Sequence, residues 1–223
     1  MSKEMIAKCR PGLNLHAAAG IVNDINFERR MIMTAAEAIE KLKAGNGRFV
    51  SGKQSDKELG AAKRRDLTEN GQHPFAVIVC CSDSRVAPEI LFDQGLGDIF
   101  IIRTAGNVVD DIGLGSIEYG AEHLNVPVIV VLGHEKCGAV KATVDGGEMH
   151  GCIKAIADKI KPSLEKVRSS ADVYGACEDE NVRTTVAEIK RNPVIAELMK
   201  EGRVTVAGAK YAISSGVVTF FEN

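Results

Sequence analysis

Three short runs of apolar residues stand out along the chain. They cover residues 75–80, 99–102 and 128–132, and polar residues do not interrupt them. A strand that is buried on both faces of a sheet has this pattern. Between the second and third runs, residues 114–124 carry apolar side chains at helical spacing. Strand–helix–strand units of this kind predict a parallel sheet with right-handed crossovers.

The rest of the pattern predicts helices around this sheet and a hairpin at its end. Thr34 and Glu37 form a capping-box sequence, which marks the start of a helix. Further helices are expected at 57–70, at 151–169 and at 181–201, the last restarting at Pro193. Residues 203–212 and 216–221 alternate like paired strands. We therefore expect an α/β fold: a single domain with a mainly parallel central sheet flanked by helices, an N-terminal helical arm, and a C-terminal hairpin or edge strand.

Length and composition agree with one domain and exclude several classes of partner. The 223 residues contain no repeat or low-complexity linker, so we divide the chain into an N-terminal extension, 1–33, and a domain, 34–223. The net charge of −2, without a long basic run, argues against nucleic-acid or membrane partners. No apolar stretch reaches the roughly 18 residues of a membrane span. Residues 1–30 lack the apolar core of a signal peptide, so we expect a cytoplasmic protein.

Two groups of chemically active residues follow the predicted strands. Cys81 ends the first apolar run and is followed by Asp83 and Arg85, while His134 and Cys137 follow the third run. Parallel sheets bind ligands beyond the carboxyl ends of their strands, so both groups should meet at one edge. Two thiolates and one imidazole suit a zinc ion that keeps a fourth position open.

The carboxylate and guanidinium beside the first cysteine favour a catalytic metal over a structural one. Arg85 can hold Asp83 in a two-pronged salt bridge and keep it ionised, which leaves Asp83 available as a base. Cys137 precedes a plausible helix start at Gly138, and a helix N-terminus favours the thiolate form. A redox pair of Cys81 and Cys137 is the alternative, but it would leave the neighbouring polar residues without a role.

Together these two motifs resemble those of the β-class carbonic anhydrases, over most of residues 34–223. The resemblance implies that Cys81, His134 and Cys137 bind one Zn²⁺ per subunit. It also implies that Asp83 and Arg85 form the catalytic pair. The expected activity is the zinc-dependent, reversible hydration of carbon dioxide to bicarbonate and a proton by zinc-bound hydroxide, which is the reaction of a carbonate dehydratase, a lyase.

The same resemblance assigns further positions to the substrate pocket. Gln72 would hydrogen-bond the substrate, and the backbone of Gly138 would line the site. Phe100, Ala105 and Tyr119 would form apolar walls around carbon dioxide. An uncharged linear substrate offers little to hydrogen-bond, which is consistent with such walls.

The resemblance also implies an assembly and a route for protons. His123 matches a position that passes protons outward, although a histidine on an exposed helix surface is the alternative interpretation. The minimal unit would be a homodimer in which the helix after Thr34 embraces the neighbour. Gln72, Phe100 and Tyr119 would then reach the pocket of the opposite subunit. Pairing of dimers into a tetramer stays open.

One branch of the family closes its site by placing the aspartate on zinc. That branch carries a tryptophan three residues before the first cysteine ligand, where this chain has Ile78, and the chain contains no tryptophan. Arg103 and Tyr211 match the other two members of the bicarbonate pocket of that branch. We therefore expect the open, plant-like arrangement, with Asp83 away from the metal.

Two other functions compete with carbonic anhydrase activity. The first is hydrolysis of carbonyl sulfide or carbon disulfide on the same scaffold, by nearly identical chemistry. The second is a non-catalytic, zinc-stabilised assembly module. In that case the protein would fill the fourth coordination position, most plausibly with Asp83.

Overall fold

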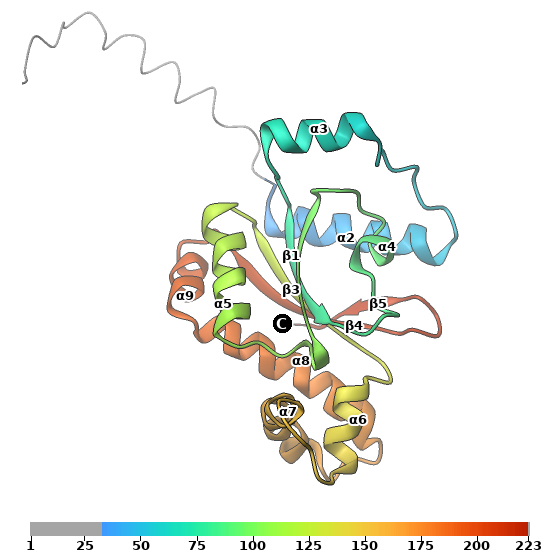
Figure 1. Ribbon diagram of the computed structural model, residues 1–223, viewed down its shortest axis with the longest axis vertical. Helices are drawn as coiled ribbons and strands as arrows, with labels where there is room; N and C mark the ends of the chain where they lie inside the picture. Colours follow the sequence, from blue (N-terminus) through green and yellow to red (C-terminus); the bar gives the residue numbers. More distant parts are fainter. Residues whose placement is uncertain (1–32, 223) are drawn as a thin grey trace, which may run out of the picture. The chain divides into compact units, whose positions relative to one another are not determined.

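One five-stranded sheet forms the centre of the molecule (Figure 1). The structure is a computed structural model, and it describes residues 33–222. The strands are β1 (Ala76–Cys81), β2 (Ile99–Thr104), β3 (Val128–His134), β4 (Thr205–Tyr211) and β5 (Val218–Phe220). They lie in the order β2-β1-β3-β4-β5, with β1 to β4 parallel and β5 antiparallel to β4. The predicted single α/β domain, with its mainly parallel sheet and C-terminal hairpin, is confirmed.

Helices flank the sheet on both faces and extend beyond its ends. The α-helices are α2 (Ala35–Val50), α3 (Ala61–Asn70), α4 (Pro88–Leu91), α5 (Asp111–Glu118), α6 (Gly138–Asp145), α7 (Ile153–Val167), α8 (Val173–Arg191) and α9 (Pro193–Lys200). A 3₁₀ turn, η1 (Ala105–Asn107), and a π-helical turn, η2 (Tyr119–His123), complete the set. The predicted capping box begins α2, and Pro193 begins α9 as expected. The predicted extension, residues 1–33, lies outside the described residues apart from Met33, so the domain boundary stays a prediction.

Three helix starts differ from the sequence-based expectation. The helix expected from residue 57 begins only at Ala61. The helix expected from residue 114 begins at Asp111, because the side chain of Asp110 accepts a hydrogen bond from the third residue of the first turn. The helix expected from residue 181 begins at Val173, because Asp172 caps it in the same way. In the last two cases a capping aspartate starts the helix earlier than its apolar periodicity does.

The strands β1 and β3 are buried on both faces, as their uninterrupted apolar runs predict. One face packs against α2 and α4, and the other packs against the α5–η2 segment, α8 and α9 (Figure 1). The first face carries Ile78, Cys80, Val130 and Leu132, and the second carries Val77, Val79, Ile129 and Val131. Burial of each such aliphatic side chain contributes about 1.5–3 kcal/mol. These two cores make the sheet a fixed platform for whatever lies at its ends.

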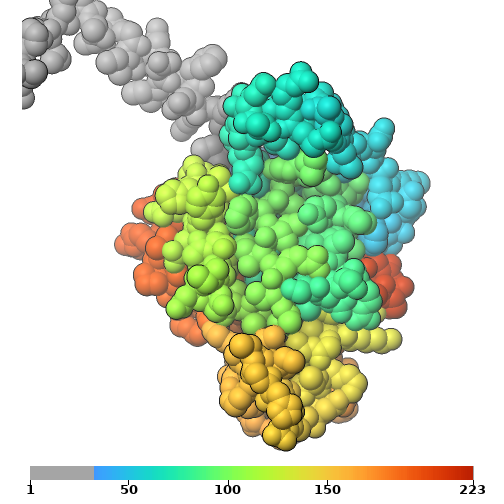
Figure 2. All heavy atoms as spheres, viewed as in Figure 1, coloured from blue at the N-terminus to red at the C-terminus, as the bar shows by residue number. Residues whose placement is uncertain are grey.

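The carboxyl ends of β1 and β3 point toward α6 and α7, which form the yellow and orange end of the molecule (Figure 2). Here the loops that follow the strands carry the residues singled out in the sequence. Between residues 33 and 222, no helix combines the length and the apolar character that a membrane crossing requires.

Candidate metal centre

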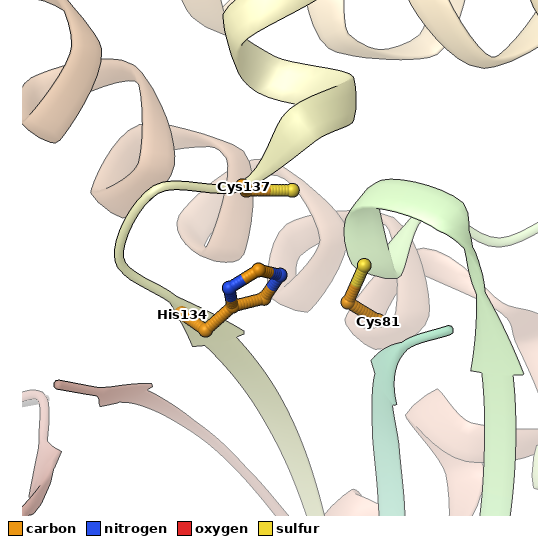
Figure 3. A group of neighbouring side chains, drawn as sticks. All are labelled: Cys81, His134 and Cys137. Atoms are coloured by element: carbon orange, nitrogen blue, oxygen red, sulfur yellow. The ribbon is translucent and has the colours of Figure 1, made fainter. Parts of the chain in front are cut away.

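Cys81, His134 and Cys137 converge at the carboxyl ends of the two central strands (Figure 3). One ligand atom from each residue lies within 4.8 Å of the other two, and all three residues are buried. This spacing suits three ligands around one metal ion. The sequence-based expectation that the two motifs meet at one edge of the sheet is therefore confirmed.

Backbone geometry delivers each ligand. Cys81 is the last residue of β1 and His134 the last of β3, and these strands are neighbours in the sheet. Cys137 is the N-cap of α6. The chain reverses between them at Lys136, whose φ of +55° lies in the left-handed region that few residues other than glycine adopt. This turn brings the second sulfur back over the end of β3.

The imidazole of His134 is arranged as a metal ligand. Its Nδ1 lies 2.9 Å from the backbone oxygen of Glu135, and since a carbonyl can only accept, Nδ1 carries the proton. The other nitrogen, Nε2, is then an acceptor that points toward the sulfurs. It is buried and has no hydrogen-bond partner among residues 33–222. A metal ion would satisfy this lone pair, whose burial without a partner is otherwise costly.

One of the two sulfurs, that of Cys81, is prepared for negative charge. A hydrogen bond between the thiols lowers the pKa of Cys81 and raises that of Cys137, because the pair keeps one shared proton. Backbone N–H groups of Asp83 and Gly106 also donate to Cys81 Sγ, at 3.4 and 3.3 Å. A divalent cation would stabilise the second thiolate in place of the proton. This donor set, with two thiolates and a neutral imidazole, fits zinc.

Asp83 and Arg85 form the predicted two-pronged salt bridge beside the ligands. Arg85 Nε donates to Asp83 Oδ1 at 2.9 Å, and Arg85 Nη2 donates to Oδ2 at 2.7 Å. The Arg85 backbone N–H adds a third bond, to Oδ1. The hydrogen bonds from Arg85 hold the pKa of Asp83 well below its ordinary value. Arg85 Nη2 also donates to the carbonyl of Lys136, and this bond joins the loop after β1 to the loop after β3.

A further arginine fixes the backbone that carries Cys81 and Asp83. Arg103 on β2 donates from Nε to the carbonyl of Cys81 at 3.2 Å and from Nη2 to that of Asp83 at 2.7 Å. The sequence offered this arginine only as a match to the bicarbonate pocket of another branch. Its register on β2, one residue before the partner of Cys81, becomes visible only once the strands are paired.

The expected pocket residues fall into two groups. Ala105 begins η1, next to the glycine that contacts Cys81, and Gly138 begins α6, next to Cys137. Gln72 is exposed in the segment between α3 and β1. The remaining expected residues, Phe100, Tyr119 and His123, lie together away from the sulfurs.

The aromatic group of Phe100, Tyr119 and His123 forms a row on the surface. The ring centroids are 6.1 Å apart for the first pair and 5.3 Å apart for the second, and Tyr119 is 48% exposed. Phe100 pairs in register with Val77, four residues before Cys81. At about 3.3 Å per residue, this places it about 13 Å along the sheet from the ligand end.

The comparisons with known proteins agree with this geometry. The profile of a family described as carbonic anhydrase matches residues 76–218. A carbonic anhydrase of Mycolicibacterium smegmatis is 45% identical over 81% of this chain and 90% of its own length. The chain belongs to the carbonic anhydrase family. Carbonic anhydrase 2 of Mycobacterium tuberculosis is 43% identical, over 80% of this chain and 89% of its own length.

Solved structures place this carbonic anhydrase in the β class. The β-carbonic anhydrase CcaA is similar with a TM-score of 0.65 and 26% identity, over 82% of this chain and 87% of that one. A tetrameric β-carbonic anhydrase from the filamentous ascomycete Sordaria macrospora has the same fold, with a TM-score of 0.68, 24% identity and coverage of 73% and 89%. The sequence-based resemblance to the β class is confirmed.

Proposed function

We propose that this protein catalyses the reversible hydration of carbon dioxide to bicarbonate and a proton, with one zinc ion per subunit. The buried cluster of Cys81, His134 and Cys137, beside the Asp83–Arg85 pair, carries the proposal. Membership of the carbonic anhydrase family supports it. The comparisons give no support to a hydrolase of carbonyl sulfide or carbon disulfide, or to a non-catalytic assembly module.

Cys81, His134 and Cys137 would hold the zinc ion. When bound, zinc supplies Lewis-acid chemistry, which makes water a nucleophile near neutral pH. The protein contributes hydrogen bonds to these ligands. Backbone N–H groups stabilise one sulfur, and a backbone carbonyl fixes the tautomer of the imidazole. With three ligands from the protein, a fourth position stays open to the reactants.

Asp83 would orient the attacking water. A carboxylate has about four positions at which it accepts hydrogen bonds. Arg85 fills two on Oδ1, through its backbone N–H and Nε, and one on Oδ2, through Nη2. The remaining position on Oδ2 is therefore free to accept a proton donor of the reaction. The salt bridge keeps the carboxylate ionised and aimed.

The same salt bridge supports the open arrangement of the site. Arg85 donates to both oxygens of Asp83, so a swing of the carboxylate onto the metal would strain or break these hydrogen bonds. Ile78 occupies the position at which the closing branch carries tryptophan, and it is fully buried in the core. We propose that Asp83 stays off the metal.

The substrate pocket would combine residues from two subunits. Ala105 and Gly138 adjoin the ligands of their own chain. Phe100 lies too far along the sheet to line the same site, and Tyr119, next to it, exposes an aromatic face. We propose that they, together with Gln72, reach the site of a second copy, in a homodimer that can pair further.

Two finer assignments complete the proposal. His123, stacked against Tyr119 at the surface, would pass protons to solvent or buffer. A cytoplasmic location would suit the chemistry, because reducing conditions keep the ligand thiols available to metal. Neither Cys81 nor Cys137 is in a disulfide.

Removal and return of zinc tests the proposed function. Dialysis against a strong chelator should abolish carbon dioxide hydration measured by stopped flow, and one equivalent of Zn²⁺ per subunit should restore it. Cys81→Ser should lose both zinc and activity. Cys152→Ser is the matched control, because Cys152 is exposed and outside the ligand cluster. A metal-free protein with full activity would contradict the proposal.

A further inference from the structure

One helix, α8, contacts Cys137 itself and a residue beside each of the other two proposed ligands. It packs against β3 and β4 (Figure 1). Glu178 and Asn181 lie three residues apart on it, so their side chains project from the same face. Both are buried, at 7% and 1% exposed. Polar side chains buried to this extent need partners, and those of Glu178 and Asn181 include the backbone of Cys137 and of Gly106.

Glu178 holds the loop that carries Cys137. Its Oε1 accepts a hydrogen bond from the backbone N–H of Cys137 at 3.2 Å. Its Oε2 lies 2.9 Å from Nζ of Lys210 on β4, and this ion pair compensates for the burial of the carboxylate. Lys210 pairs with Asp179 as well, at 2.7 Å. The start of α6 is thus tied to α8 and to the sheet at one point.

Asn181 acts on Cys81 through one intervening residue. Its Nδ2 donates to the carbonyl of Gly106 at 2.7 Å, and the N–H of Gly106 donates to Cys81 Sγ. Gly106 has a φ of +73°, and a Cβ there would lie 2.9 Å from a side-chain atom of Ile160. The asparagine therefore fixes the carbonyl of Gly106, a residue in the left-handed region that favours glycine, and the N–H of the same residue, in the preceding peptide, is aimed at the sulfur.

The third ligand lies beside a close contact of the same helix. Gly133 immediately precedes His134, and a Cβ at this position would lie 2.4 Å from Val182 Cγ2 on α8. Gly208 on β4 meets the same valine, where a Cβ would lie at 2.9 Å. Two glycines on neighbouring strands thus let α8 settle directly on the end of the sheet. This fixes the distance from α8 to the imidazole ligand.

We propose that Glu178 and Asn181 are positioning residues that set the affinity of the site for zinc. Glu178 holds the backbone of Cys137, and Asn181 holds the glycine that donates to Cys81 Sγ. Both thereby remove ordering that metal binding would otherwise have to supply. Neither residue touches the proposed reactants. The inference rests on the ligand set of the proposed function, and it adds that α8 is the part of the fold that holds this set in place.

Zinc affinity, measured apart from turnover, tests this inference. Glu178→Ala and Asn181→Ala are titrated against a chromophoric zinc chelator at fixed pH. We expect each to raise the dissociation constant for zinc roughly 10–100-fold, the usual effect of losing a residue that supports a ligand. Replacement of zinc by Co²⁺ gives a second readout, because the sulfur-to-cobalt absorption bands should shift when the loops are no longer held.

Two variants separate positioning from general destabilisation. Gln94→Ala removes another buried amide, which donates to the carbonyl of Phe92 in the turn before the amino end of β2, so it should lose stability but keep zinc affinity. Asp179→Asn removes a partner of Lys210 without touching a ligand loop, and it too should bind zinc normally.

Glu178→Gln is the conservative variant that keeps the test valid if Glu178→Ala does not fold. The glutamine keeps an acceptor for the Cys137 N–H, so most of the affinity lost in Glu178→Ala should return. Equal affinity for zinc in the parent, Glu178→Ala, Asn181→Ala and Gln94→Ala would overturn the inference. A parent that binds no zinc would instead overturn the proposed function, so the two failures are distinguishable.

Discussion

The position of the proton on the His134 ring determines which ring nitrogen can bind a metal ion. The Glu135 carbonyl accepts the Nδ1 proton, so Nε2 presents its lone pair to the two sulfurs. The Asp83 carboxylate is specified just as narrowly, because Arg85 takes three of its accepting positions and leaves one. These two side chains leave few alternatives for binding the metal or for orienting a reactant.

Asp83→Asn should separate metal binding from turnover. The amide loses the negative charge and places an NH₂ group where Arg85 donates, so the side chain can no longer hold the reactant. We expect kcat for carbon dioxide hydration to fall about 10²-fold or more, the range for removal of an acid–base group. Zinc content should not change, because Asp83 is outside the ligand cluster.

The control for this variant is Asp158→Asn. Asp158 also pairs with cations, Lys154 and Lys161, but it lies on the exposed surface of α7. It should hydrate carbon dioxide at the parent rate by stopped flow. An Asp83→Asn enzyme as fast as this control would remove Asp83 from the mechanism.

The ligands could be predicted from the sequence, and the residues that support them could not. Cys81 and His134 follow uninterrupted apolar runs, so the edge of the sheet at which they meet is predictable from strand pattern alone. Glu178 stands in a Glu-Asp-Glu run that has the composition of a solvated helix face. Its burial depends on Lys210, some thirty residues later in the sequence. No local pattern encodes that pairing.

At the scale of elements, Asp93 joins three segments near β2. Its carboxylate receives Nε of Arg48 from the end of α2 at 2.5 Å and Nζ of Lys57 at 2.6 Å, and the N–H and hydroxyl of Ser55 also donate to it. Burial opposes ionisation, but these donors outweigh it and hold the pKa of Asp93 below its ordinary value. The contact fixes the segment between α2 and α3 to the turn after α4.

Asp93→Asn should lower the free energy of unfolding at pH 7 by about 1.5–3 kcal/mol, since hydrogen bonds to a buried charge are lost. A lowered pKa means that the stabilisation is fully present above the unfolded pKa of about 4 and disappears as the pH falls through the lower folded value. Urea unfolding at pH 7 and along a series below pH 4 measures the difference.

The parent and Asp93→Asn should therefore converge in stability only in acid. Asp66→Asn is the control, because Asp66 is exposed on α3 and its ion pair with Lys63 is long, at 3.9 Å. A difference between parent and Asp93→Asn that stayed constant down to pH 2 would contradict the assigned ion pairs.

Element boundaries followed polar caps more closely than apolar periodicity. Asp110 and Asp172 each start a helix before the apolar stripe becomes recognisable. In α8 the early turns are buried because of tertiary contacts. Cys177 packs in one cluster with Cys81 and Cys137, and Glu178 accepts a hydrogen bond from the Cys137 N–H. A sequence window cannot anticipate that environment. It does locate the strands, whose burial on both faces leaves a pattern in the sequence itself.

For the whole molecule, the parallel sheet was predictable and its order was not. Strand β1 lies between β2 and β3, which places the ends of β1 and β3 side by side. The same order leaves β2 at the edge of the sheet, with Phe100 on this strand and the exposed Tyr119 next to Phe100. This edge is the part of the surface that we propose a second copy covers.

Subunit mixing tests the shared site. Cys81→Ser lacks a ligand but keeps Phe100, while Phe100→Ala keeps all three ligands. If Phe100 serves the neighbour, a mixed dimer contains one complete site, and the coexpressed pair should hydrate carbon dioxide faster than either variant alone.

The control pair combines Cys81→Ser with His134→Ala. It should recover nothing, because the only chain with an intact ligand set is absent. A fully active monomer in sedimentation velocity, or a coexpressed pair no faster than its parts, would contradict the dimer.

Glu135 connects the metal centre to the end of the chain. Its carbonyl accepts a hydrogen bond from His134 Nδ1, and its N–H donates to the carbonyl of Tyr211. Its carboxylate accepts a hydrogen bond from the N–H of Ser214 in the C-terminal hairpin. A displacement of that hairpin would therefore be transmitted to the imidazole through Glu135 alone. We therefore expect changes in this hairpin to alter zinc affinity, although the hairpin itself supplies no proposed ligand.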